Sequence, residues 1–254
     1  MIKIHSMSFS YGKKKVLNNV DLYLKKGSLT ALIGLNGAGK STIFGCLTKS
    51  NKISKGSITV DGINIDNYAY ADYARVVSIV PQVTSLIQND VLVRDFLVEG
   101  RTPYLKNFSV PCEKDYEIVE ATAKDFNIEN LLDSNFSKLS GGQQQMILIA
   151  RTLVQNTPII LFDEPMSSLD LKNQYVILRI IKQLSKEGKT IIFSTHNPNH
   201  ALLLNCDVAL LKNGEILRHG DVNFCFNDEG IKVIFGENVV INKCDRGNYI
   251  DIIW

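Results

Sequence analysis

Short runs of apolar residues predict the strands of a buried parallel sheet. Leu29–Ile33, Ile159–Phe162 and Thr190–Phe193 are almost continuously apolar and lack the alternation of a half-exposed strand. Such runs are typical of strands that helices cover on both faces. Each run ends where glycine or polar residues begin. Because ligands of open α/β sheets bind beside the carboxyl ends of the strands, the pattern predicts a site at these three ends.

Tight-turn sequences between apolar segments predict three antiparallel hairpins. The turns are Asp61-Gly62 in a β-rich N-terminal part, Asn213-Gly214, and the tail segment Asp245–Asn248. The predicted strand pairs are Ile58–Val60 with Ile63–Ile65, Val208–Leu211 with Glu215–Leu217, and Val239–Lys243 with Tyr249–Ile253.

Helical periodicity takes over between about Thr84 and Gln155, where no buried-strand run appears. We expect an α/β domain over residues 1–225, with a helical subdomain inserted at about 84–155, and a C-terminal β-hairpin extension over 226–254. The predicted helices are Lys40–Leu47, Val91–Glu99, Asp115–Phe126, Gly142–Val154 and the amphipathic Val176–Leu184, which ends before Gly188.

Composition narrows the classes of partner. The 254 residues carry 28 basic and 26 acidic side chains, a net charge of +2, so we expect no nucleic-acid partner. Five scattered cysteines rule out zinc-ribbon and CxxC patterns and fit buried thiols in a reducing cytosol. The N-terminus does not resemble a signal peptide, and no run approaches the ~20 apolar residues of a membrane helix. A membrane role is therefore expected to come only through a partner.

The segment that follows Leu29–Ile33 has the spacing of a phosphate-binding loop. Its glycines allow backbone torsions and close approaches that a Cβ would block, so that loop amides and a helix N-terminus can cradle an anion. Lys40 supplies a charge for the β- and γ-phosphates, and the Ser41 hydroxyl can ligate Mg²⁺. The expected ATP-binding residues are Gly34, Leu35, Asn36, Gly37, Ala38, Gly39, Lys40, Ser41 and Thr42.

Two adjacent carboxylates end the run Ile159–Phe162. Asp163 is placed to hold Mg²⁺ through water, and Glu164 to orient or deprotonate an attacking water. On its own, such a pair could simply be a solvated cap on a strand. In a chain that also has a phosphate loop, we expect Asp163 to be a metal residue and Glu164 to be catalytic.

A second candidate anion site begins at Leu139-Ser140-Gly141-Gly142-Gln143. Ser140 is a good N-cap for the helical run behind it, so exposed amides and the positive end of a helix dipole would meet a ligand there. An ordinary capped helix start is the alternative reading. The residues themselves do not say whose phosphate this site meets.

The order and spacing of these three motifs resemble those of the ABC-type ATPases, from about Ile2 to Gly220. The resemblance implies the ABC ATPase fold: a phosphate-loop α/β core with a parallel sheet, an N-terminal antiparallel β part and a helical insert. It implies that two copies sandwich two ATP molecules head to tail, with Ser140, Gly141, Gly142 and Gln143 closing over the ATP of the other copy. Gln144 and Met146 depart from the commoner arginine pattern after this motif and leave the assignment intact.

Four smaller elements also resemble the family. The resemblance implies that Gln82 contacts Mg²⁺ and water, and that Ser167–Asp170 crosses the dimer interface, with Asp170 near the nucleotide. His196 would contact the γ-phosphate, and Tyr11 would stack on adenine. A plain surface tyrosine is the alternative for Tyr11.

A further segment bears on the job of the ATPase. Val98–Leu105 contains Gly-Arg101-Thr-Pro-Tyr104 and resembles the import ATPases for iron-siderophores, haem, cobalamin and related metal chelates. In that family this region docks on transmembrane permease subunits. Arg101 could also cap a helix or pair with Glu99. The resemblance implies a peripheral subunit on the cytoplasmic face of the membrane. A substrate-binding protein would be its indirect partner.

Two alternatives remain open at this level. A transporter for another cargo, such as free metal ions or an exported molecule, would share every ATP motif. A non-transport ABC protein would usually need long coiled coils or tandem ATPase segments, which the chain lacks. The C-terminal hairpin could be regulatory or serve only packing.

Overall fold

The computed structural model describes residues 1–82, 90–106, 109–167, 169–244 and 247–252. The strands are β1 Ile2–Tyr11, β2 Lys14–Leu24, β3 Leu29–Ile33, β4 Lys55–Val60, β5 Ile63–Asn64, β6 Val77–Val80, β7 Ile159–Phe162, β8 Thr190–Thr195, β9 Asp207–Lys212, β10 Glu215–Asp221, β11 Val239–Cys244 and β12 Gly247–Ile252. The helices are α1 Lys40–Leu47, α2 Tyr70–Ala74, α3 Val93–Val98, α4 Glu113–Asp125, α5 Gly141–Val154, α6 Leu171–Lys186, α7 Asn199–Leu204, α8 Val222–Cys225 and α9 Asp228–Phe235. Four 3₁₀ turns are η1 Ile65–Asn67, η2 Glu99–Tyr104, η3 Glu129–Leu131 and η4 Phe136–Lys138.

A central sheet with the order β10-β9-β3-β8-β7-β6 organises the molecule. Its strands β9, β3, β8, β7 and β6 pair in parallel, and β10 closes one edge antiparallel to β9. The three apolar runs predicted as buried strands are therefore adjacent strands. Their carboxyl ends meet at one edge of the sheet, which is where the candidate site lies.

The side chains of the central strands alternate between two hydrophobic clusters. Ala31 and Ile33 of β3 belong to one cluster, and Leu32 between them belongs to the other. The strands β7, β8 and β9 divide in the same way. The first cluster extends into the helical insert, α6 and the C-terminal elements, and the second extends to α1 and the N-terminal strands. Continuous apolar runs result because both faces of the sheet are covered.

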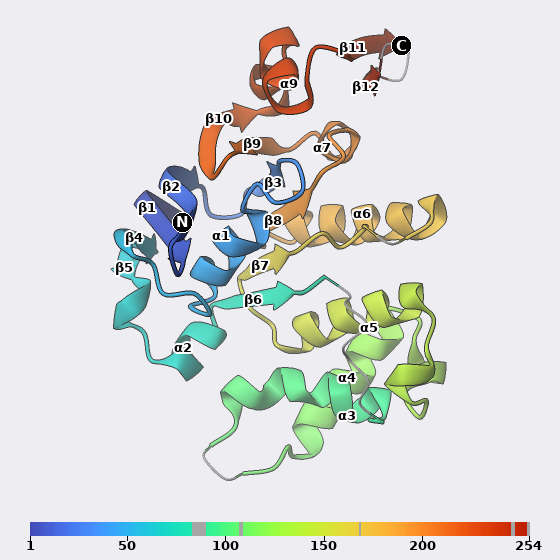
Figure 1. Cartoon of the computed structure of the whole chain (residues 1–254). Coiled ribbons are helices and arrows are strands. Elements are labelled where there is room, and N and C mark those ends of the chain that lie inside the picture. The colour runs from blue at the N-terminus through green and yellow to red at the C-terminus, as the bar shows by residue number, and fades with distance from the viewer. Residues whose placement is uncertain (83–89, 107–108, 168, 245–246, 253–254) are drawn as a thin grey trace.

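The N-terminal strands form a separate antiparallel sheet with the order β2-β1-β4-β5. Helix α1 lies between this sheet and the central one (Figure 1), and its buried Ile43, Phe44, Cys46 and Leu47 pack in the second cluster. The predicted α/β core and N-terminal antiparallel part are both present.

The helical insert lies on the other side of the molecule, at the bottom of Figure 1. Helices α3, α4 and α5 pack on one another, and Phe96 stacks near Phe136 at 4.6 Å between ring centroids. The predicted helices of the insert match these three within a few residues. The predicted start of the insert, Thr84, lies outside the described residues.

The C-terminal part holds more structure than the sequence predicts. The expected hairpin is present as β11 and β12, at the top of Figure 1, but α8 and α9 precede it. Asn227 caps α9 by accepting a hydrogen bond from the Gly230 amide, and Ile231 and Ile234 are buried in the first cluster. No helix in the described part of the chain is long and apolar enough to span a bilayer.

Candidate active site

The phosphate loop and the ends of β7 and β8 line one pocket of about 540 Å³. Its lining comes from segments far apart in the sequence: most follow the carboxyl ends of strands of the central sheet, and Val16 comes from β2 of the N-terminal sheet. The lining residues are Val16, Asn36, Gly37, Gly39, Lys40, Ser41, Thr42, Gln82, Glu164, Ser167 and His196. The structure thus brings the phosphate loop together with Gln82, Glu164 and His196, as the sequence predicts.

The loop backbone is shaped for an anion. Gly39 has φ 111° and a Cβ there would lie 2.8 Å from Leu17 Cδ2, so only glycine fits. Gly34 packs so closely on the Leu211 carbonyl that a Cβ would collide with it. Helix α1 starts at Lys40 with no side-chain cap in the described structure, which leaves its first N–H groups available to a phosphate.

Lys40 and Glu164 form the centre of the pocket. The Lys40 Nζ lies 2.9 Å from Glu164 Oε1, and the two side chains are only 5% and 10% exposed. Lys40 also donates to the Gly34 and Leu35 carbonyl oxygens at 2.7 and 3.2 Å. His196 Nδ1 lies 2.9 Å from the other carboxylate oxygen, Glu164 Oε2, and the imidazole is half exposed. One carboxylate therefore bridges a buried ammonium and an imidazole that reaches solvent.

The charge state of Glu164 follows from these neighbours. Burial raises the pKa of the carboxyl, but the hydrogen bond and charge of Lys40, together with His196, outweigh burial and hold the pKa below its ordinary value. Glu164 is consequently ionised at neutral pH. Glu164 can orient a water molecule and accept its proton once the Lys40 ammonium moves toward a phosphate.

A residue that sequence reasoning missed holds both acidic groups in place. Ser194 Oγ donates to Asp163 Oδ1 at 2.8 Å and accepts from the Glu164 amide at 2.8 Å. Glu164 has φ 44°, a left-handed conformation that costs a non-glycine residue free energy and concentrates at functional sites. The hydroxyl of Ser194 stabilises this turn from β8. The signal in the sequence was a buried-strand run that changes to serine and threonine at its carboxyl end.

Three oxygen-bearing side chains predicted to hold Mg²⁺ gather near the pocket. Ser41 and Gln82 line it, and Asp163 lies just behind, 9% exposed and bonded to Ser194. Gln82 Nε2 donates to Ser167 Oγ at 3.1 Å. Hydroxyl, amide and carboxylate oxygens are the ligand chemistry Mg²⁺ prefers beside substrate phosphates, so these residues fit the ion.

The other predicted residues lie apart from this pocket. Tyr11 is 54% exposed, packs edge-on against Phe9 at 4.7 Å, and accepts a hydrogen bond from Asn51. Asp170 caps α6 through the Asn173 amide at 2.8 Å, which explains why this helix begins at Leu171, earlier than predicted. Ser168, in the predicted interface segment, lies outside the described residues.

The Leu139–Gln143 motif forms the predicted capped helix start. Ser140 and Gln143 of α5 make a reciprocal capping box, in which each side chain bonds the backbone of the other. Ser140, Gly141 and Gln143 are exposed, and a Cβ on Gly141 would meet only open space. None of these residues lines the phosphate-loop pocket among the described residues. The capped start of α5 is therefore a surface separate from this chain's own phosphate-loop pocket.

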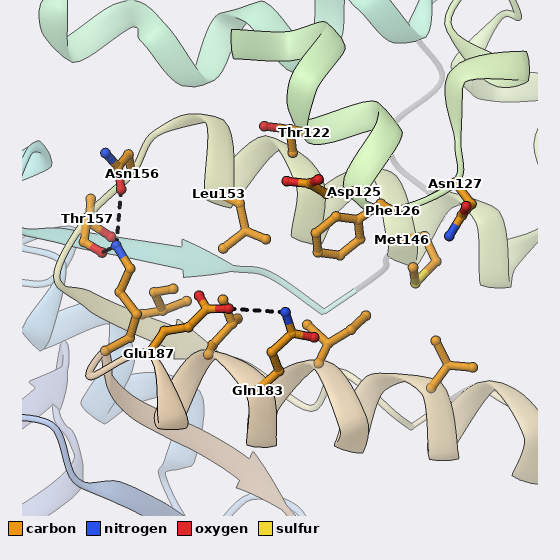
Figure 2. Close-up of a pocket in the computed structure, with 15 residues that line it drawn as sticks. Thr122, Asp125, Phe126, Asn127, Met146, Leu153, Asn156, Thr157, Gln183 and Glu187 are labelled. Carbon is orange, nitrogen blue, oxygen red and sulfur yellow. Dashed lines mark hydrogen bonds between the residues drawn. The ribbon is translucent and has the colours of Figure 1, made fainter.

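A second pocket of similar size, about 550 Å³, lies between the helical insert and α6 of the core. Figure 2 shows Phe126, Met146 and Leu153 on its insert side and Gln183 and Glu187 on α6 opposite. Lys189 also lines this pocket, and its ammonium donates hydrogen bonds to the Asn156 side chain and the Thr157 carbonyl. It shows no group suited to phosphate chemistry among its described lining, so we assign the reaction to the phosphate-loop pocket.

The loop that carries His196 is braced from within by His200. This second histidine is buried, with Nδ1 3.0 Å from Thr195 Oγ1 and Nε2 3.4 Å from Asn197 Nδ2. The side-chain amide of Asn197 donates to Nε2 of His200. The neutral ring therefore carries its proton on Nδ1 and donates it to Thr195 Oγ1. Burial, with a smaller contribution from His196, lowers the pKa of His200 from 6.5 to about 4.

This pKa predicts a pH dependence of stability. Between about pH 6.5 and pH 4, His200 is protonated in the unfolded chain but stays neutral in the folded chain. The folded state is therefore stabilised above this window, and this stabilisation is lost as the pH falls through it. From about pH 7 to pH 5 we expect the wild-type free energy of unfolding to drop about 2 kcal/mol more than that of His200→Gln. Urea titrations at both pH values measure this difference.

The matched control is His5→Gln, because His5 is exposed and paired with Asp21 on the surface. It should follow the wild type. Equal drops for the wild type and His200→Gln would show that His200 titrates normally in the folded chain.

Comparisons with known proteins agree with this geometry. Residues 17–167 match the family model described as ABC transporter. An uncharacterised ABC transporter ATP-binding protein of Methanocaldococcus jannaschii is 35% identical over 96% of this chain and 94% of its own. A petrobactin import ATP-binding protein of Bacillus subtilis is 31% identical over 97% of both chains.

Among solved structures, a metal-chelate type ABC transporter in an inward-facing conformation superposes with a TM-score of 0.85 and 26% identity, covering 99% of this chain and 96% of that one. The matched regions contain the phosphate loop, the acidic pair and the Leu139–Gln143 motif at the positions described above. The chain therefore belongs to the ABC transporter family, and its fold is that of the family's ATPase subunit.

Proposed function

We propose that this chain binds and hydrolyses ATP to energise an ABC importer for an iron-siderophore, haem, cobalamin or similar metal chelate. The observation that carries the ATPase part is the bridge Lys40–Glu164–His196 inside the phosphate-loop pocket. The cargo class rests on the similarity to a petrobactin import protein over 97% of both chains.

The proposal gives each group in the pocket a role. The Gly34–Thr42 backbone cradles the phosphates, and Lys40 turns from Glu164 toward the β- and γ-phosphates. Ser41, Gln82 and Asp163 would hold Mg²⁺, which when bound would neutralise charge that develops on the phosphate oxygens. Glu164, freed from Lys40, positions water in line with the γ-phosphate, and His196 lies where it can contact that phosphate. Tyr11, exposed at the end of β1, is available to stack on adenine.

A second copy of the chain supplies what the pocket lacks. Ser140, Gly141 and Gln143 at the start of α5 are exposed, and they are not among the described residues that line the phosphate-loop pocket of their own chain. At the start of α6, directly after Asp170, Leu171 and Tyr175 expose 84% and 59% of their surface four residues apart. We infer that these surfaces meet in a head-to-tail dimer in which each Ser140–Gln143 motif closes over the other copy's ATP.

The structure distinguishes between the two local roles expected for Arg101 in the predicted docking segment. The guanidinium is only 13% exposed; it pairs with Asp115 at 3.0 Å and donates to the Val154 carbonyl at 3.1 Å. It also lies 4.0 Å from the Tyr104 ring centroid. Arg101 thus caps the C-terminal end of α5 and does not pair with Glu99, which pairs with Arg151. Arg101 fixes the shape of the segment.

A groove beside this segment fits a permease contact. It has a volume of about 300 Å³ between α2, β6 and α5, and its lining includes Tyr70, Pro81 and Arg151. Tyr104 donates to the Gln155 carbonyl at 3.0 Å, and Arg75 donates to the Pro103 carbonyl at 2.8 Å, so η2 ties both sides of the groove together. We propose that permease subunits dock here, which holds the chain on the cytoplasmic face of the membrane and links it indirectly to a substrate-binding protein.

Glu164→Gln tests the ATPase mechanism. The variant keeps the shape and a hydrogen bond to Lys40 but loses the carboxylate that accepts a proton, so ATP binding should persist within about threefold while turnover falls by 10² or more. Phosphate release and nucleotide titration measure the two quantities.

Glu187→Gln is the matched control, since that carboxylate lines the other pocket. Its turnover should equal the wild type. Wild-type turnover in Glu164→Gln would remove this residue from the base role.

Arg101→Gln and Tyr104→Phe test the docking surface. Each removes a bond that holds η2 to α5, so ATP-dependent uptake should fall about tenfold, while ATP affinity of the isolated subunit changes less than about twofold. Uptake of a labelled chelate by cells or vesicles that contain the whole transporter, with nucleotide titration of the subunit, measures both.

Tyr23→Phe is the control, because the Tyr23 hydroxyl contacts only Met1 at the far N-terminal sheet. Normal uptake by both docking variants would place the permease contact elsewhere.

A further inference from the structure

The C-terminal hairpin is attached to the active-site loop by one side chain. Asn199, three residues after His196, donates through Nδ2 to the Ile250 carbonyl at 3.0 Å and accepts at Oδ1 from the Ile250 amide at 2.8 Å. The pairing imitates the two bonds that one strand residue makes with another. Helix α7 is thereby joined to β12 as though it were a further strand at that residue.

The hairpin also packs on the core through apolar side chains. Its two strands pair only with each other in the sheet topology. Ile250 is 8% exposed and joins the first hydrophobic cluster, against which Val239 and Ile241 are partly buried. Apolar packing holds the hairpin against the core. The two hydrogen bonds of Asn199 fix its orientation and register relative to α7, because hydrogen bonds are directional and apolar contacts are not.

Asn199 also stands at the end of a chain of bonds that reaches His196. The Asn199 amide donates to Asn197 Oδ1 at 3.0 Å, and the Asn197 amide donates to Thr195 Oγ1 at 3.1 Å. His200 bonds both Thr195 and Asn197. His196 is the one member of the segment 195–200 whose side chain turns to the pocket, at 2.9 Å from Glu164. Its backbone is therefore set by neighbours that are fixed to β8 on one side and to the hairpin on the other.

We propose that Asn199 is a positioning residue for ATP hydrolysis, and that through it the C-terminal hairpin sets where His196 stands in the pocket. The inference rests on the proposed contact of His196 with the γ-phosphate. In this proposal the hairpin affects turnover without touching the nucleotide.

Two variants of the full chain test the proposal. Asn199→Ala removes both bonds to Ile250, and Asn199→Asp keeps the shape and the acceptor but cannot donate to the Ile250 carbonyl. We expect kcat for ATP to fall about tenfold with KM changed less than about twofold, the pattern of a misplaced rather than a missing catalytic group. Hydrogen exchange at the Ile250 amide should speed up in Asn199→Ala, since that amide is the other half of the clamp.

Coupling between two sites is reciprocal, which gives a second readout. Binding of a non-hydrolysable ATP analogue to the wild type should slow exchange at Ile250, and Asn199→Ala should abolish this slowing. A residue that only stabilised the fold would not link nucleotide to the hairpin amide.

Lys212→Met is the matched control. It cuts another tie of the C-terminal part, the bond from Lys212 Nζ to the Val233 carbonyl at 2.6 Å, and leaves α7 alone. Its kcat and its nucleotide-linked exchange at Ile250 should equal the wild type.

Four outcomes overturn the inference. Wild-type kcat in both Asn199 variants with faster Ile250 exchange in Asn199→Ala would show that the hairpin is released without consequence. Unchanged Ile250 exchange in Asn199→Ala would show that the clamp does not hold the hairpin. Wild-type turnover in His196→Ala would remove the proposed role of His196 and the inference with it, whereas loss of turnover there beside normal Asn199 variants would overturn the inference alone.

Discussion

A buried ammonium that must be paired governs the architecture of this active site. Lys40 is 5% exposed at the start of α1, and Glu164 at the end of β7 neutralises it at 2.9 Å. Removing one partner from such a pair costs about 3–5 kcal/mol, because the other charge stays buried. The pairing of Lys40 with Glu164 also bears on the proposed hydrolysis of ATP. Any anion strong enough to draw Lys40 away leaves an ionised Glu164 close to it, so the arrival of a phosphate and the release of the base are one event.

That pair exists only because the central sheet is covered on both faces. Parallel strands with alternate residues in two clusters bring β3, β7 and β8 side by side, and their carboxyl ends then deliver the phosphate loop, Glu164 and His196 to one edge. The first cluster continues without a break from these strands into the insert that carries Ser140 and into the C-terminal elements. Packing thus joins the nucleotide pocket to the surfaces proposed for the second copy, the permease and the hairpin.

The strands, the insert and the pocket could be predicted because each has a local signature. A continuous apolar run marks a doubly covered strand, and the glycine spacing of 34–39 marks a backbone that must approach an anion. Ser194 and Asn199 could not be predicted, because their roles depend on partners 30 and 51 residues away in sequence. For Arg101 the sequence left two local roles open, a helix cap or a pair with Glu99. The structure has the helix cap, at the Val154 carbonyl that ends α5, and adds a pair with Asp115 that no local pattern indicates. Helix α9 escaped prediction although it is as long as α1, because α1 follows a phosphate loop that predicts a helix and no such motif precedes α9.

The central claim is that this ATPase works on a membrane permease. The most direct measurement is affinity purification of the tagged chain from detergent-solubilised membranes of its own cell, followed by mass spectrometry of what it retains. The account predicts a partner with many membrane helices, recovered in a stable complex, with a metal chelate or a substrate-binding protein alongside it. Recovery of the chain only with soluble, ribosomal or DNA-bound proteins would contradict the importer and leave the ATPase without its proposed task.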